Sequence, residues 1–184
     1  QGACMPAHLT PEPLRDDALP FLQGGVTQVG ILVEDLDRTV DDYHRLFGIG
    51  PWHFYTYERP LVREMTYRGE PADYSMRIAL SYFGPTRVEL IQPVRGPSLY
   101  DEFIAAHGYG VQHFGLYVPN MQAALAQARE AGFSLLMDGR GFGPDGDGWY
   151  AYLDTEARFG ITLELIERPA RRHPPEKIVP AEAE

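Results

Sequence analysis

Two glutamates lie in the middle of strongly apolar segments with the pattern of β-strands. Glu89 is the only charged residue of the segment VELI at 88–91, and Glu164 occupies the same place in LELI at 163–166. A carboxylate among apolar neighbours is costly to bury unless it is paired with a positive charge or binds a cation. Two such carboxylates in matching surroundings indicate a site for a divalent metal ion.

Two further candidate ligands, Gln28 and His113, open segments of similar sequence. The segment QVGILVEDL from residue 28 matches HFGLYVPNM from residue 113 almost class for class. A lone histidine near the start of a strand is more often structural, so the interpretation of His113 depends on this repeat. The four side chains offer one imidazole nitrogen, one amide oxygen and two carboxylates, and such a set suits Zn, Co, Ni, Mn or Mg. We therefore predict metal ligation by Gln28, Glu89, His113 and Glu164.

The elements that must position these side chains occur twice in the same order. The first copy is predicted as a strand at 26–33, a helix at 38–47 and strands at 53–57 (or on to 67), 75–83 and 86–92. The second is predicted as a strand at 112–118, a helix ending at Gly132 and strands at 133–137, 149–153 and 161–166. Two copies of this kind predict a pseudo-twofold pair of half-domains. A chance likeness is the alternative, since many α+β chains contain strand, helix and glycine in this order.

Both ends of the chain are rich in Pro, Ala and charged residues. We divide the sequence into an N-terminal arm at 1–24, a first βαβββ module at 25–95, a linker helix at 96–110, a second βαβββ module at 111–167 and a C-terminal tail at 168–184.

The composition excludes several classes of protein. The formal net charge of -10 disfavours binding to nucleic acid, and the single cysteine, Cys4, excludes an internal disulfide and a multi-thiolate zinc site. No apolar run reaches the ~18 residues that cross a bilayer, and residues 1–20 lack the pattern of a secretory signal. We expect a cytoplasmic protein that does not bind membranes.

Residues 25–167 resemble the vicinal-oxygen-chelate (VOC) superfamily, which includes glyoxalase I, methylmalonyl-CoA epimerase, extradiol dioxygenases and bleomycin-binding proteins. The segments most similar to the epimerase branch are VELIQP at 88–93, SLYDEF at 98–103 and GYGVQH at 108–113. The resemblance implies an α+β fold in which two βαβββ modules form a U-shaped mixed β-sheet cavity. It also implies one divalent metal ion, a small-molecule carbonyl substrate and a homodimer.

The ligand set departs from that of the epimerases. Those enzymes usually have histidine where this chain has Gln28, and a second histidine where it has Gln112. The combination of Gln, Glu, His and Glu instead resembles eukaryotic glyoxalase I. An amide oxygen is a weak donor, so Gln28 could contact substrate rather than metal. The same residue counts against an iron dioxygenase, whose facial triad needs two histidines.

The resemblance also implies which residues move the proton. Enzymes of this arrangement chelate two neighbouring substrate oxygens on the metal while a base removes the proton next to the carbonyl. By resemblance to glyoxalase I, Glu164 is the first candidate for the base, with Glu89 as its partner in a two-base epimerisation. If both glutamates remain ligands, the base is sought in the second strand and the loop that follows it, where the candidates are Tyr55, Tyr57, Glu58 and Glu64.

The first half is rich in aromatic residues. Most strand aromatics belong to the core, but the substrate-binding candidates among them are Trp52, Tyr55, Tyr57 and Tyr82. Such a lining favours an apolar or aromatic substrate, because only Arg59, Arg63 and Arg68 stand near it for the phosphates of a CoA carrier. The glycine-rich segment 138–148 opens no helix, so it is interpreted as a flap over the pocket or as a plain hairpin connection.

These observations favour a metal-dependent lyase or isomerase, of epimerase, racemase or glyoxalase type, that acts on a small to medium-sized carbonyl compound. The alternative from another class is a non-catalytic protein that sequesters an antibiotic-like molecule. A metal-dependent ring-cleaving dioxygenase is the third interpretation. The joint presence of Glu89, His113 and Glu164 favours the first, since a sequestering protein does not need all three.

Overall fold

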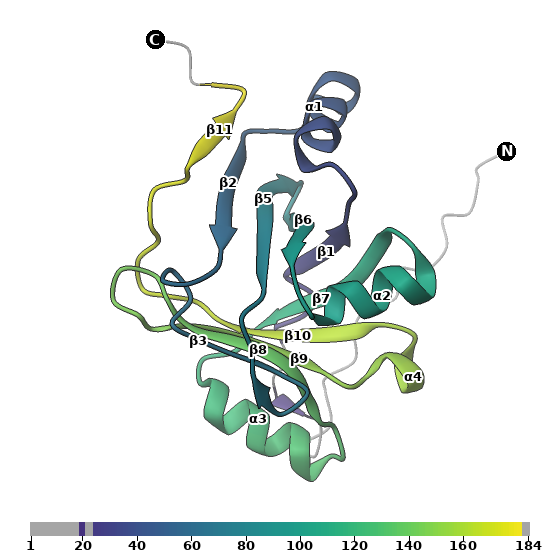
Figure 1. Cartoon of the computed structure of the whole chain (residues 1–184), viewed down its shortest axis with the longest axis vertical. Coiled ribbons are helices and arrows are strands. Elements are labelled where there is room, and N and C mark those ends of the chain that lie inside the picture. Colours follow the sequence, from purple (N-terminus) through teal and green to yellow (C-terminus); the bar gives the residue numbers. More distant parts are fainter. Residues whose placement is uncertain (1–18, 21–23, 182–184) are drawn as a thin grey trace, which may run out of the picture.

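One mixed β-sheet forms the body of the protein. A computed structural model describes residues 19–20 and 24–181, so Cys4 and most of the predicted N-terminal arm lie outside the described residues. The strands follow the order β11-β2-β5-β6-β1-β7-β10-β9-β8-β3-β4. The sheet curls into a half-barrel, so that strands β2, β5 and β6 cross the direction of strands β8, β9 and β10 (Figure 1). Among the described residues, no helix combines the length and the apolar character that a membrane span requires.

Each half of the sheet contains one copy of the predicted module. The first copy consists of β1 (Gln28–Leu32), α1 (Leu36–Phe47), β2 (Trp52–Tyr57), β5 (Ser75–Phe83) and β6 (Thr86–Arg95). The second consists of β7 (Gly110–Tyr117), α3 (Met121–Glu130), β8 (Leu135–Phe142), β9 (Gly148–Leu153), the short helix α4 (Glu156–Phe159) and β10 (Thr162–Glu167). Additional elements are β3 (Glu64–Tyr67), β4 (Glu70–Pro71), α2 (Leu99–His107) and β11 (Lys177–Val179).

The strand pairing shows the pseudo-twofold relation directly. In the first module β1 runs parallel to β6, with Gly30 opposite Glu89. In the second module β7 runs parallel to β10, with Gly115 opposite Glu164. The modules join through the antiparallel pair β1 and β7, in which Gln28 lies opposite Gly115 and Gly30 opposite His113. The predicted α+β architecture of paired modules in a curled mixed sheet is confirmed.

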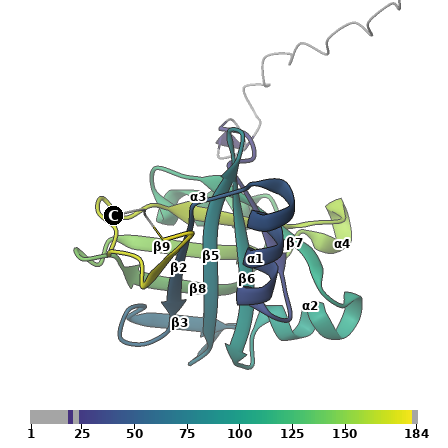
Figure 2. The same ribbon diagram turned by 90° about the horizontal axis from the view of Figure 1, so that it is seen from above.

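Each face of the curled sheet has its own core. Helix α1, which begins after the cap residue Asp35 and ends at the left-handed Gly48, packs Leu36 and Val40 against the outer face of the first module. Helix α3 covers the outer face of the second module, and Figure 2 shows α1 and α3 over different parts of the sheet. The inner face carries a separate cluster rich in tyrosine.

Two peripheral strands differ from the sequence prediction. The stretch that could have extended the strand at 53–57 to residue 67 breaks after Tyr57, and β3 pairs with β8 of the other module. The first half therefore contributes a strand to the far edge of the second half. At the opposite edge, β11 from the C-terminal segment pairs with β2.

The glycine-rich segment 138–148 belongs largely to the sheet. Strand β8 continues to Phe142 and pairs with β9. Of the two predicted alternatives, residues 138–142 therefore form part of a hairpin and not a flap over the pocket. Gly139 is needed for close packing, because a Cβ at this position would lie 2.2 Å from Cζ of Tyr150. Gly139 and Gly148 thus make room for Tyr150 and Phe142 of the inner face.

Candidate metal centre

Four adjacent strands bring the predicted ligands together. Gln28 comes from β1, Glu89 from β6, His113 from β7 and Glu164 from β10, and these strands are neighbours in the order β6-β1-β7-β10. These residues are 1%, 7%, 0% and 4% exposed, respectively. Residues that are distant in the sequence thus meet on the inner face of the sheet.

The distances between the polar atoms are short. The Nε2 atom of His113 lies 3.1 Å from Oε2 of Glu164 and 3.5 Å from Oε2 of Glu89. The amide of Gln28 donates from Nε2 to Oε2 of Glu89 at 2.9 Å and to Oε2 of Glu164 at 3.0 Å. One ligand atom from each of Glu89, His113 and Glu164 lies within 4.8 Å of the others. All four side chains point to one small volume.

Two glycines related by the pseudo-twofold make space for this convergence. A Cβ at Gly30 would lie 1.9 Å from Cε1 of His113. A Cβ at Gly115 would lie 2.8 Å from Cβ of Gln28 and 3.2 Å from Oε2 of Glu164. The first module therefore supplies Gln28 and the glycine beneath His113. The second module supplies His113 and the glycine beneath Gln28.

The hydrogen bonding of His113 suits a metal ligand. Its Nδ1 lies 2.7 Å from Oε1 of the buried Gln112, and because an amide oxygen can only accept, Nδ1 carries the proton. The Nε2 atom, which faces the two carboxylates, is then free to offer its lone pair to a cation, and such outer hydrogen bonds commonly orient metal-binding histidines. The Nε2 of Gln112 has no hydrogen-bond partner among the described residues.

The electrostatics of the cluster favour a positive charge at its centre. Burial lowers the pKa of His113, but the carboxylates of Glu164 and Glu89 outweigh this effect and raise the pKa from 6.5 to about 9. A protonated imidazole therefore offsets part of the negative charge of the carboxylates in the metal-free protein. A divalent cation can replace that proton, and the nitrogen and carboxylate donors match a borderline or hard ion. The described residues fit the metal that the sequence predicts.

Gln28 is held in a specific orientation by Arg87. The Nε atom of Arg87 donates to Oε1 of Gln28 at 2.6 Å, so the oxygen of this amide points away from the carboxylates. For Gln28 to ligate an ion through Oε1, its amide would have to rotate. That rotation would place Nε2, a hydrogen-bond donor, next to the Nε donor of Arg87. The structure thus brings Gln28 to the centre as a hydrogen-bond donor, while Glu89, His113 and Glu164 present atoms that can ligate directly.

Tyrosines fill much of the inner face around the centre. The ring of Tyr152 packs edge-on to His113, with 5.2 Å between centroids, and its hydroxyl lies 2.9 Å from that of Tyr100. Tyr57 stacks on Tyr150, with 6.2 Å between their centroids. Burial raises the pKa of Tyr57 to about 12, so this residue remains protonated near neutral pH and is a poor base.

The predicted substrate-binding residues are divided between the faces of the sheet. Tyr55 and Tyr57 lie on the inner face, and Tyr82, which is 60% exposed, lies at the rim of a pocket beside the centre. Trp52 does not reach the site. Side chains alternate along β2, and Trp52 is fully buried on the outer face beneath α1, where its ring contacts Tyr43.

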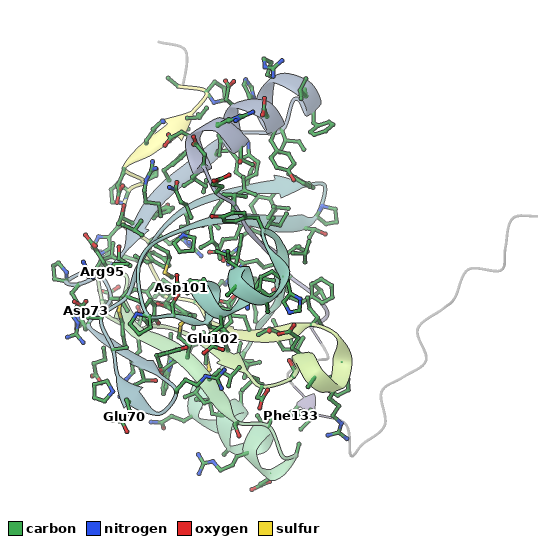
Figure 3. All side chains as sticks on the ribbon, turned by 45° about the vertical axis from the view of Figure 1, so that its right-hand side comes forward. Glu70, Asp73, Arg95, Asp101, Glu102 and Phe133 are labelled. Atoms are coloured by element: carbon green, nitrogen blue, oxygen red, sulfur yellow. The ribbon has the colours of Figure 1, made fainter. Side chains whose placement is uncertain are left out.

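The alternative carboxylate bases lie on the surface. The side chain of Glu64 is 63% exposed and lies 2.6 Å from the guanidinium of Arg140. Glu58 lies 4.0 Å from Arg95 in an exposed group of charges, in which Arg95 also binds Asp73 at 3.0 Å. Figure 3 shows Arg95 and Asp73 near each other at the edge of the molecule. Glu58 and Glu64 therefore do not join the buried cluster.

Sequence reasoning assigned no role to three residues that the structure places at or beside the centre. These are Arg87, Gln112 and Arg172. The alternation of β6 does put Arg87 on the face of Glu89, and Gln112 precedes His113 directly, so a sequence signal existed for both. No signal exists for Arg172, since its position depends on the path of the C-terminal segment.

Comparison with known proteins decides the family. Residues 27–152 match the Glyoxalase/Bleomycin resistance protein/Dioxygenase superfamily. The chain belongs to this superfamily. Superfamily membership and the buried Glu89, His113 and Glu164 group together agree with the predicted metal-binding, glyoxalase-like character at a coarse level. No curated protein matches the chain in a sequence comparison.

Solved structures of low sequence identity share the fold. A methylmalonyl-CoA epimerase in complex with methylmalonyl-CoA and NH4+ is 23% identical with a TM-score of 0.59, and the match covers 81% of this chain and 97% of that one. A methylmalonyl-CoA epimerase from Mycobacterium tuberculosis is 24% identical with a TM-score of 0.55, over 79% and 88% of the two chains. A hypothetical protein from Bacillus halodurans is 18% identical with a TM-score of 0.55, over 80% and 96%.

Proposed function

We propose that this chain is a metal-dependent isomerase or lyase of the superfamily that moves a proton at a carbon next to a carbonyl group. The observation that carries the proposal is the convergence of Glu89, His113 and Glu164 from three strands on one buried volume. A bound divalent cation would supply Lewis-acid stabilisation of the negative charge that develops when a proton leaves such a carbon.

The two carboxylates are suited to hold that proton. Glu89 and Glu164 come from equivalent strands of the two modules and approach the centre from opposite sides of the pseudo-twofold. Proton removal by Glu164 and return by Glu89 to the same carbon would invert that carbon, while return by Glu164 to the neighbouring carbonyl carbon would give an isomerisation. Gln28 donates two hydrogen bonds toward these carboxylates and would orient them or a substrate oxygen.

The wall of the site limits the substrate. The tyrosines of the inner face are packed against one another, and Tyr57 closes on Phe142 with 5.4 Å between ring centroids. A small or medium-sized carbonyl group therefore fits at the centre, and any larger carrier would lie outside the sheet. The low-identity likeness to a structure that contains methylmalonyl-CoA supports including acyl-CoA thioesters among the candidate substrates.

Solvent deuterium exchange at the carbon next to the carbonyl tests the proposal. The metal-supplemented protein is incubated in D2O with acyl-CoA thioesters, hemithioacetals and aromatic ketones, and exchange is followed by NMR. At least one class should exchange, and Glu164→Gln should slow the exchange by about 10²- to 10⁴-fold. Glu130→Gln, on the exposed face of α3, is the matched control and should leave the rate unchanged. Absence of exchange in every class, with tight binding retained, would instead identify a binding protein.

A further inference from the structure

We infer that a pocket beside the metal centre binds a carboxylate group of the substrate. The anion pocket, as we call it, has a volume of about 280 Å³ and is lined by residues that include His53, Tyr55, Ser81, Arg87 and Arg172. The inference rests on the proposed function for the reaction, and it adds the chemical class of the substrate: a carbonyl compound that also carries an acid group.

The charge of the anion pocket is opposite to that of the protein. The formal net charge of the chain is -10, yet the lining contains two arginines and neither aspartate nor glutamate. A buried charge without a partner is costly, so a positive pocket in an acidic protein indicates an anionic ligand. Guanidinium groups bind carboxylates through paired N–H donors.

Arg87 forms the inner end of the pocket. The residue is 7% exposed, its Nε donates a hydrogen bond to Gln28, and its guanidinium lies 5.3 Å from the ring centroid of Tyr117. Arg87 forms no other side-chain hydrogen bond and no ion pair with the described residues. Its remaining N–H donors are therefore available to a ligand in the pocket.

Arg172 forms the outer end of the pocket. It belongs to the segment between β10 and β11 and lines the pocket together with Tyr55 of β2. Burial raises the pKa of the Tyr55 hydroxyl, and the nearby positive charge of Arg172 offsets part of that rise. Within the described part of the chain Arg172 has no carboxylate partner. The neighbouring Arg171 differs, since it is bound to Asp145 at 2.5 Å.

The position of Arg87 sets the distance between the two ends of the substrate. Arg87 and Glu89 lie two residues apart on the same face of β6, which separates their backbones by about 7 Å. Leu80, which lines the anion pocket, pairs directly with Glu89. A chain of about two or three carbons therefore links the carbonyl at the centre to the acid group at Arg87. The pocket volume fits such a short acid and not a nucleotide carrier.

Two matched acids test the inference by calorimetry with the Co2+-supplemented protein. Both 2-oxoglutarate and 2-oxopentanoate offer the same pair of neighbouring oxygens, and only 2-oxoglutarate has a second carboxylate at the far end. The wild-type protein should bind 2-oxoglutarate at least about tenfold more tightly, because a charged hydrogen bond to guanidinium is gained.

Variants assign that preference to the pocket. Arg172→Gln should remove most of the preference for 2-oxoglutarate and leave the affinity for 2-oxopentanoate unchanged. Arg171→Gln is the control and should retain the preference for 2-oxoglutarate. Arg87→Met should abolish the preference. Because Arg87 is buried, the fold of this variant is checked by circular dichroism. If Arg87→Met does not fold, the variant at the exposed Arg172 still tests the inference.

Failure of the pocket and failure of the metal chemistry give different results. Equal affinity of the wild-type protein for the two acids, or an equal loss for both in Arg172→Gln, would overturn the anion pocket. If the protein does not bind Co2+, the same comparison is made without metal between glutarate and pentanoate. Selective binding of glutarate that is lost in Arg172→Gln would then support the pocket and overturn only the proposed reaction.

Discussion

At the scale of the residue, the centre depends on two glycines, which leave space because they have no side chain, as much as on the ligands. Gly30 and Gly115 lie directly beneath His113 and Gln28, and neither glycine needs a left-handed backbone. The requirement is therefore steric, and it can be tested without changing the backbone conformation. The repeat in the sequence already aligns these glycines, although their purpose follows only from the antiparallel contact of β1 and β7.

Substitution of Gly30 by alanine should displace the imidazole of His113. The new Cβ would lie 1.9 Å from Cε1, so Gly30→Ala should weaken metal binding by at least tenfold and destabilise the protein by about 1–3 kcal/mol. Metal titration and urea denaturation measure the two effects. Gly24→Ala, at a position with nothing within 4 Å of the new Cβ, is the control. Normal metal affinity in Gly30→Ala would contradict the assigned position of His113.

Gln112 should act as a positioning residue for His113. Gln112→Leu removes the acceptor of the Nδ1 proton and should lower metal affinity by about 10- to 100-fold, measured by competition with a chelator. Gln112→Glu retains an acceptor oxygen and should restore most of the affinity. Equal affinities of Gln112→Leu and the wild-type protein would show that this hydrogen bond does not orient the ligand.

At the scale of the element, the sequence predicts the eight core strands and both long helices better than the edges of the sheet. Their periodicity is strong because each strand buries one or both faces, and the caps Asp35 and Asn120 mark where α1 and α3 begin. The edge strands β3 and β11 are short, and their partners lie in the other module or at the far end of the chain. Local pattern contains no information about such distant pairing.

Asp138 shows what the local pattern missed. Its place in a glycine-rich stretch suggested a loop, yet it is 4% exposed and accepts hydrogen bonds from Trp149 Nε1 and Thr66 Oγ1. The hydroxyl of Tyr74 also donates to its backbone oxygen at 2.7 Å. This residue therefore joins β3 and β9 to β8.

Asp138→Ala should loosen that edge of the sheet. Two partly buried donors lose their acceptor, so the free energy of unfolding should fall by about 2–3 kcal/mol in urea denaturation. Asp154→Ala, at an exposed aspartate, should change it by less than about 0.5 kcal/mol. A loss of similar size in both variants would show that β3 is not held through Asp138.

At the scale of the whole molecule, the stability of the metal-free protein should depend on the charge of His113. The pKa of this group is about 9 in the folded protein, against 6.5 for an unperturbed histidine. Because the folded pKa is the higher one, the contribution is fully present below pH 6.5 and is lost as pH rises through 9. It amounts to at most about 3 kcal/mol.

Urea denaturation of chelator-treated protein at pH 6 and at pH 9.5 checks this linkage. The wild-type protein should lose more stability over this range than His113→Asn, which has no proton to release at this position. In the metal-loaded protein the ion replaces the proton, so metal affinity should rise with pH over the same window. A wild-type profile identical to that of His113→Asn would mean that the carboxylates do not hold the imidazole charged.

The central claim is that side chains from both modules bind one metal ion, and the metal content of the purified protein tests it most directly. Elemental analysis after supplementation with Zn, Co, Ni or Mn and removal of excess ion should give about one equivalent per chain. His113→Ala should retain the fold and lose nearly all of that metal. A supplemented wild-type protein without bound metal, or His113→Ala with a full equivalent, would contradict the account.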